Sequence, residues 1–413
     1  MKQKLQNTLL RARHRLCAFL RRRDPAEYLI ALTLAGLFIL CLRGMIFGSD
    51  ALIGLFFKGC DDLFMDFFHP VRDAARGVGV YTELGSIYPP LSNLLIFLLS
   101  LVIPEEYLDA PREQAGSFSQ YPAAMLCFVF FFLACFLLLS LILQREGEPG
   151  AKRQLLTLSL LCSFPFLFLV ERGNTMILCL AAMLLFTQNY QSESRAWREV
   201  ALLSLAFATA LKFYPVLLGA VLLADKRWRD ALHAAIYGLL FLFLPSLFYR
   251  GPVSVFWAIK YTLGFSRASS GLSVDFMEKT GIPLQLGGAV LFGFYIFIIL
   301  LAALSALLEK KPWKAWMMAG MAMLTMPSIF SSYNWLLLLP ALVVFLRSEK
   351  LQGKNWLYFF AMTLPFFTYP PRVAQDALLV CCLLALYALY LPEIISNFRN
   401  FLKNKKQSSP ELS

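Results

Sequence analysis

The sequence is poor in charged residues. Only 15% of its 413 residues are Asp, Glu, Lys or Arg, whereas a soluble domain contains about 25%. Histidine is scarcer still, with three residues in the whole chain. A chain with so little charge and so much apolar surface cannot hide that surface in one water-soluble core of this size. The composition therefore excludes a cytosolic enzyme and a disordered chain.

Two further absences narrow the class of protein. The nine cysteines show no paired spacing typical of a metal site or a disulfide framework, and most of them lie inside apolar runs. This excludes a secreted disulfide scaffold and indicates small buried apolar side chains. The sequence also has no glycine-rich nucleotide-binding loop, which argues against an ATP-driven pump or a cytoplasmic nucleotide-sugar enzyme. We therefore expect no cofactor.

Apolar residues, by contrast, are abundant. They make up 59% of the chain and include 38 phenylalanines, and the mean hydropathy is +0.63. This predicts a membrane-embedded protein with many spans. The net charge of +12 does not indicate a nucleic-acid partner, because Lys and Arg lie in short clusters between the apolar runs and at the two tails, as topology determinants do.

The chain divides into three segments by charge and hydropathy. Residues 1–27 are basic with interleaved leucine, which is typical of an amphipathic helix on an anionic cytoplasmic leaflet. Residues 28–391 form one polytopic membrane domain, whose first apolar run, 28–48, is too long for a signal-peptide core. Residues 392–413 form a basic cytoplasmic tail.

The number of spans has to be decided from charge, since several apolar runs are shorter than the roughly 20 residues of a straight span. In one model the run 89–103 re-enters on the same side and 199–224 forms two spans that turn at Lys212. In the other, 89–103 crosses and 199–224 is a single span. The positive-inside rule favours the first model, and Pro89 and Pro90 suit a re-entrant segment. It predicts an all-α, multi-pass cell-membrane protein with about 12 spans, one re-entrant segment and both termini cytoplasmic.

This topology puts nearly every polar motif on the extracytoplasmic side. The first outer loop, 49–121, would carry helices along the membrane surface, and a second long outer loop would cover 249–283. Polar groups at membrane depth are costly and usually mark function. We therefore predict a single extracytoplasmic active site.

Asp66 is the best candidate for a general base. It lies between Met65 and Phe67-Phe68, and apolar surroundings disfavour the charged form of a carboxylate, which suits proton abstraction. A helix cap or an ordinary surface acid is the alternative. Arg172 and Lys212 lie in tight turns between apolar runs and are candidates to bind an anionic group such as a lipid phosphate. They could equally pair with a local acid, Glu171 in the case of Arg172.

A metal site has little support in the sequence. His69 is the one histidine in the predicted outer loops, and no second His or Cys stands at a useful spacing from it. Asp61 and Asp62 could hold a divalent ion, although an aspartate pair is a nonspecific signal. We therefore predict no metal site. If the protein does depend on a divalent metal, Asp61 and Asp62 are the residues expected to bind it.

Four short segments stand in order along the chain: Met65-Asp66-Phe67-Phe68, Val80-Tyr81, Ile87-Tyr88-Pro89-Pro90-Leu91 and Ser332-Tyr333-Asn334. They resemble segments of family 87 glycosyltransferases, which are polyprenyl-phosphate-mannose-dependent mannosyltransferases of the GT-C superfamily. Two further motifs, Arg172-Gly173-Asn174 and Lys212-Phe213-Tyr214-Pro215, are similar to motifs of GT-C mannosyltransferases of the GPI pathway. The resemblance covers roughly residues 28–350.

The resemblance implies transfer of a hexose, expected to be mannose, from a polyprenyl-phosphate carrier to a lipid or glycan acceptor, with inversion at the anomeric carbon. It makes Asp66 the catalytic base, and Arg172 and Lys212 then stabilise the leaving phosphate. Other GT-C branches carry an Asp-x-Asp metal motif, whereas Asp61 and Asp62 are adjacent here. The substrate-binding candidates are His69, Tyr88, Asn174, Tyr214, Tyr333 and Asn334.

Two alternative functions remain. A lipid or solute transporter would suit the proline-interrupted spans, but its charges are expected near the membrane midplane rather than at one interface. An envelope glycan polymerase or acyltransferase would also act at the outer face. An acyltransferase would require a paired nucleophile or base, usually a histidine, in the outer loops. His69 is the one histidine there, so the sequence gives this function little support.

Overall fold

The computed structural model describes residues 24–48, 63–108, 121–145, 150–268, 284–325 and 331–408, and each regular element in these ranges is a helix. The predicted all-α class is therefore confirmed. The helices up to the middle of the chain are α2 (Pro25–Phe47), α4 (Met65–Ala75), α5 (Gly79–Thr82), α6 (Pro90–Ser100), α7 (Glu105–Leu108), α8 (Pro122–Arg145), α9 (Ala151–Leu161), α10 (Phe164–Arg172), α11 (Met176–Asn189) and α12 (Arg195–Leu211).

The second part of the chain alternates α-helices with short 3₁₀ helices. These elements are η3 (Tyr214–Gly219), α13 (Ala220–Ala224), α14 (Trp228–Phe243), η4 (Pro245–Tyr249), α15 (Val253–Ala268), α17 (Leu284–Leu308), α18 (Pro312–Thr325), η5 (Ser332–Leu338), α19 (Leu339–Ser348), α20 (Asn355–Phe367) and α21 (Arg372–Ser408). Most of the basic segment 1–27, Asp61 and Asp62, and parts of both long loops lie outside the described residues.

Helix starts follow from local sequence. Asp24 caps α2, and its carboxylate accepts hydrogen bonds from the backbone N–H groups of Ala26 (3.0 Å) and Glu27 (3.3 Å). Proline occupies the first turn of α2, α6, α10, η3, η4 and α19. Its fixed φ and missing N–H suit that position, so these prolines mark helix boundaries inside long apolar stretches of sequence.

The helices include several that can cross a bilayer. Four described segments are long and apolar enough: Pro25–Phe47, Pro122–Arg145, Trp228–Tyr249 and Ala374–Asn404. Helices α9 and α10 make a fifth span if they are counted as one segment bent by 51°. Helix α6, with 11 residues, is about 16 Å long, roughly half the hydrocarbon thickness. The predicted count of about 12 spans stays a prediction.

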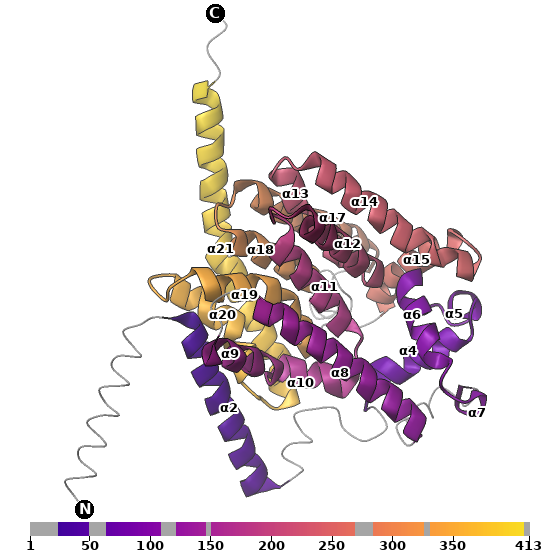
Figure 1. The fold of residues 1–413 in the computed structure, drawn as a ribbon. Coiled ribbons are helices and arrows are strands. Elements are labelled where there is room, and N and C mark those ends of the chain that lie inside the picture. The colour runs from indigo at the N-terminus through magenta and orange to yellow at the C-terminus, as the bar shows by residue number, and fades with distance from the viewer. Residues whose placement is uncertain are drawn as a thin grey trace, which may run out of the picture.

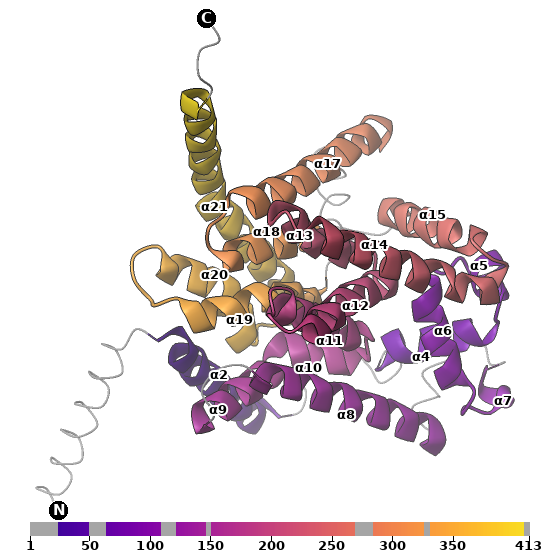
Figure 2. The same cartoon turned by 45° about the horizontal axis from the view of Figure 1, so that its top comes forward.

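Burial separates a central group of helices from a lipid-facing shell. Along α11, α18 and α19 most side chains are buried. Helix α14 has no buried side chain, and α8 exposes Leu126, Phe130, Leu133, Leu137 and Leu141. Both views show α8, α11, α12 and α14 side by side (Figures 1 and 2). Large apolar side chains on the outer helices are typical of a membrane protein.

The helices of the first long loop gather at one end of the bundle. Helix α4 packs on α6, α5 contacts α4 and α15, and α6 lies against η4. Figure 2 shows α4, α5, α6 and α7 together, on the far side of the bundle from α21. At the predicted turn, α12 ends at Leu211 and η3 begins at Tyr214, so Lys212 lies between two helices. This arrangement brings the first loop beside the ends of α10 and α12.

Candidate active site

Asp66 lies in the first turn of α4 and is contacted from two distant parts of the chain. Its Oδ1 accepts a hydrogen bond from Arg172 Nη2 at 2.6 Å, which is also an ion pair. Its Oδ2 accepts bonds from Asn174 Nδ2 at 2.9 Å and from the Tyr333 hydroxyl at 3.2 Å. Three elements therefore converge on one carboxylate: α4, the turn between α10 and α11, and η5.

The turn that carries Arg172 and Asn174 depends on Gly173. Gly173 ends α10 with φ +70°, in the left-handed region that glycine adopts without strain. A Cβ at this position would lie 2.9 Å from the Phe67 Cβ and 3.2 Å from the Phe64 Cα. The Phe64 backbone N–H also donates to the Glu171 carbonyl at 2.9 Å. The glycine thus lets this turn approach the start of α4, where Asp66 lies.

Asn174 is held so that its amide N–H₂ group faces Asp66. Its Oδ1 accepts a hydrogen bond from the Met176 backbone N–H at 2.9 Å, at the start of α11. Its Nδ2 donates both to Asp66 and to the Tyr333 hydroxyl, the latter at 3.0 Å. The residue is buried, with 3% of its surface exposed. Since its acceptor is used by the backbone, the side chain offers only donors to the site.

Tyr333 is fixed by its neighbours in η5. Its ring stacks on Phe168 of α10, with ring centroids 6.2 Å apart. The preceding Ser332 hydroxyl donates to Gln375 Oε1 at 3.1 Å, and the following Trp335 indole donates to the Met362 carbonyl at 2.8 Å. These bonds to α20 and α21 attach η5 to the second half of the bundle and aim the Tyr333 hydroxyl at Asp66.

Lys212 reaches the same region from the end of α12. Its ammonium group lies 4.4 Å from the centroid of the Tyr88 ring, within cation–π distance. In the same turn, the Tyr214 hydroxyl lies 4.0 Å from the Met176 sulfur. Burial lowers the pKa of Lys212, and the negative charge of Asp66 acts in the opposite direction. The turn therefore presents a desolvated cation beside the first-loop helices and the start of α11.

Two side chains hold Tyr88 in place, and one of them, Asn93, was not singled out from the sequence. The Tyr88 carbonyl accepts hydrogen bonds from the Tyr81 hydroxyl at 2.7 Å and from Asn93 Nδ2 at 3.3 Å. Asn93 also donates to the Ser86 hydroxyl at 3.1 Å. The signal that could have found Asn93 is an amide inside the otherwise apolar run 89–103. It is buried, as a side chain that fixes the backbone would be.

The structure thus brings together Asp66, Arg172, Asn174 and Tyr333, with Lys212, Tyr88 and Tyr214 alongside. Asn334 follows Tyr333 in η5 and is buried. His69 is half-buried one turn after Asp66 on α4. Within the described ranges, no group of three or more His, Cys, Asp or Glu residues is placed to hold a metal ion; Asp61 and Asp62 lie outside those ranges. The roles of these residues stay predictions.

The sequence model of glycosyltransferase family 87 matches residues 87–340. The match includes Arg172, Asn174, Lys212 and Tyr333, whereas Asp66 precedes it and joins these residues only through the fold. No curated protein matches the chain, and no solved structure matches it. Since the matched range is more than half of the chain and the helices are typical of a membrane protein, the chain belongs to glycosyltransferase family 87 and is a membrane glycosyltransferase.

Proposed function

We propose that the protein transfers a hexose, with mannose as the first candidate, from a polyprenyl-phosphate carrier to a lipid or glycan acceptor, with inversion. The observation that carries this proposal is the Asp66 carboxylate, held by Arg172, Asn174 and Tyr333, with the Lys212 ammonium group in the neighbouring turn. A fixed carboxylate beside two cations suits a reaction that moves a proton and releases an anionic leaving group.

Asp66 acts in this proposal as the general base. An ionised carboxylate has about four acceptor positions, and three of those on Asp66 are occupied in the described structure. The remaining position, on Oδ1, accepts the proton of the acceptor hydroxyl. The hydroxyl oxygen forms its bond to the anomeric carbon as the bond from that carbon to the phosphate oxygen breaks. The lipid phosphate leaves with the electron pair.

Arg172 and Lys212 bind the phosphate in this scheme. Arg172 is shared: it pairs with Asp66 at rest and turns toward the phosphate as negative charge develops there. The change of partner couples proton abstraction by Asp66 to departure of the leaving group. Asn174 and Tyr333 keep the carboxylate oriented while its cation is engaged elsewhere, and His69, Tyr88, Tyr214 and Asn334 line the space for sugar and acceptor.

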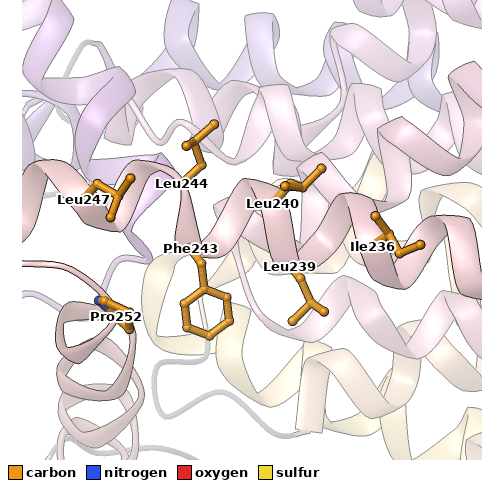
Figure 3. A pocket seen from close by; sticks show the side chains of 7 residues that line it. All are labelled: Ile236, Leu239, Leu240, Phe243, Leu244, Leu247 and Pro252. Carbon is orange, nitrogen blue, oxygen red and sulfur yellow. The ribbon is translucent and has the colours of Figure 1, made fainter.

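An apolar groove on α14 and η4 supplies a path for the polyprenyl chain. It has a volume of about 500 Å³, and the side chains that line it come from α14, η4 and the segment that follows (Figure 3): Ile236, Leu239, Leu240, Phe243, Leu244, Leu247 and Pro252. Next to its η4 end, the Tyr249 ring lies 5.4 Å from the Tyr81 ring, and Tyr81 donates to the Tyr88 carbonyl. A chain in this groove would lead toward Lys212.

We place the active site on the extracytoplasmic side and both termini in the cytoplasm. Two basic segments support this orientation: the α17–α18 connection, with Lys310 and Lys311, and the residues before α20, with Lys350 and Lys354. Figure 2 shows α18 and α20 on the other side of the bundle from α4, the helix that carries Asp66, as the positive-inside rule expects. A cysteine at the exposed Thr82 should then react with an impermeant reagent in intact cells, and a cysteine at the exposed Lys350 only after permeabilisation.

A transporter is the competing function. The described charged groups of the site lie at the ends of α10 and α12 and at the start of α4 rather than in the middle of long spans, which favours chemistry at an interface over passage through the midplane. Uptake or flipping of a lipid without formation of a new glycosidic bond would instead support transport.

The decisive experiment measures transfer from labelled polyprenyl-phosphate sugars to extracted envelope lipids by the purified protein. Asp66→Asn keeps the size of the side chain but cannot accept the proton, so transfer should fall by at least about 10²-fold while donor binding is retained. Asp73→Asn, on the same helix and paired with Arg72, is the matched control and should stay active. Normal transfer by Asp66→Asn would refute the proposed mechanism. A chelator in the assay tests dependence on a divalent metal.

A further inference from the structure

A polar pocket, separate from the apolar groove on α14 and η4, lies at the junction of α17, α18, α20 and α21. It has a volume of about 710 Å³, and the charged side chains that line it are Lys310, Lys311, Lys314, Lys354, Glu309 and Glu393. None of these residues belongs to the candidate active site. Four lysines against two glutamates leave the pocket with an excess of positive charge.

This pocket is remote from Asp66. Helix α18 begins at Pro312 beside the pocket, and the chain that leaves its other end at Thr325 leads to Tyr333. A helix of 14 residues is about 21 Å long. Figures 1 and 2 both show α21 and α4 on opposite sides of the bundle. The pocket and the active site therefore lie at opposite ends of the molecule.

The carboxylates in and beside the pocket already have partners. Glu393 accepts from Lys314 and, at 3.4 Å, from Lys354. Glu349, at the edge, pairs with Lys311 at 2.7 Å. Two lysines thus share one carboxylate, so their charge is only partly balanced and a second anion would find unused N–H donors there.

Glu309 and Lys310 are the remaining charged residues of the pocket, and Lys310 leaves positive charge available for a ligand. Glu309 accepts from Asn397 Nδ2 of α21 at 2.9 Å, and the charge of Lys314 also acts on it, so Glu309 and Glu393 together balance Lys314. Lys310 is exposed and forms no ion pair within the residues that the structure describes. Lys310 and the partly balanced Lys354 therefore supply charge for a ligand without loss of the Lys314–Glu393 contact.

The walls of the pocket also contain apolar side chains. Leu307, near the end of α17 and three residues before Lys310, lines the pocket and is 63% exposed. In the proposed orientation, α17 runs from Leu307 back into the membrane. A free phosphate would use the lysines but leave Leu307 uncovered. A phospholipid would cover both, because its acyl chains would lie along α17 from Leu307.

We propose that this pocket binds the phosphate headgroup of an anionic phospholipid at the face opposite the active site. The headgroup contacts Lys310 and Lys354, while Lys314 stays paired with Glu393. Binding of one lipid in this position would attach α21 to the ends of α17 and α18.

The test is native mass spectrometry of the full-length protein with phosphatidylglycerol, phosphatidylcholine or soluble glycerol phosphate as the probe. The wild type should retain phosphatidylglycerol in preference to phosphatidylcholine. The double variant Lys310→Gln/Lys354→Gln should lower that retention at least about tenfold, since each lysine near an anionic lipid contributes about 1 kcal/mol. Lys350→Gln, at an exposed position four residues before Lys354 and outside the pocket lining, should match the wild type.

Three results would overturn the proposal. Equal retention of the two lipids by the wild type would remove the headgroup preference. Unchanged retention by the double variant, with a melting temperature like that of the wild type, would remove the role of the lysines. Binding of glycerol phosphate as tight as that of the lipid would make the pocket a site for soluble anions.

Discussion

Arg172 and Asp66 form an ion pair across 106 residues of sequence, with Nη2 and Oδ1 separated by 2.6 Å. The side chains are 12% and 21% exposed, so the pair is mostly shielded from water. In such a setting, removing one partner leaves the other charge without compensation. The pair therefore has a structural consequence that can be separated from its proposed catalytic role.

Arg172→Ala should destabilise the protein more than Arg172→Ala combined with Asp66→Asn, since the double variant leaves no unpaired charge. We expect a loss of about 2 kcal/mol for the single variant, below the 3–5 kcal/mol typical of a fully buried pair. Thermal unfolding in detergent measures the difference, and Arg229→Ala, at an exposed position, serves as the control. Additive losses in the double variant would show that the two side chains are not coupled.

Gly173→Ala should displace α4 from the α10–α11 turn. The substitution combines a left-handed backbone, which costs a non-glycine residue about 1–3 kcal/mol, with a Cβ only 2.9 Å from the Phe67 Cβ. Gly353 is a matched control: its φ is +52°, but a Cβ there would meet nothing within 4 Å. Gly173→Ala should lower both the melting temperature and the transfer rate, and Gly353→Ala only the melting temperature, by less. Equal effects of the two substitutions would contradict the proposed close approach.

The fold class was predictable, because long apolar runs with few charges leave helices as the main option in a membrane. The convergence of the motifs was predictable in part. Helix ends alternate between two faces, so Asp66, Arg172 and Lys212 fell on one predicted face before any contact was known. The number of spans was not settled in this way, since bent and short helices such as α9, α10 and α6 do not reveal from composition whether they cross.

The hydrogen-bond and ion-pair partners within the site could not be predicted from the sequence. Glu171 was the local candidate partner of Arg172, whereas the structure pairs Arg172 with Asp66. That contact depends on how α4 packs against the turn at Gly173, which no local pattern encodes. Asn93 was missed for a similar reason, because its function is to hold a backbone carbonyl rather than to face a substrate.

The alkaline limb of the pH profile should report Lys212. Burial lowers its pKa, so the ammonium group loses its proton at a lower pH than an ordinary lysine, whose pKa is about 10.4. If the cation binds the donor phosphate, kcat/KM for the donor should fall as pH rises, with a midpoint below that value. Lys212→Arg should remove this limb, since a guanidinium stays charged and also stacks on aromatic rings. A limb unchanged in Lys212→Arg would assign the titration to another group.

The groove on α14 and η4 should set the dependence on the length of the donor's lipid. Phe243 lines the groove, and full burial of such a side chain against a ligand contributes about 1.5–3 kcal/mol. Phe243→Ala should therefore raise KM for a long polyprenyl-phosphate donor about tenfold, leave kcat unchanged, and have no effect with a donor of one isoprene unit. Phe256, exposed on α15 outside the groove lining, provides the control Phe256→Ala. Loss of activity with both donors would mean that Phe243 supports the fold rather than the lipid chain.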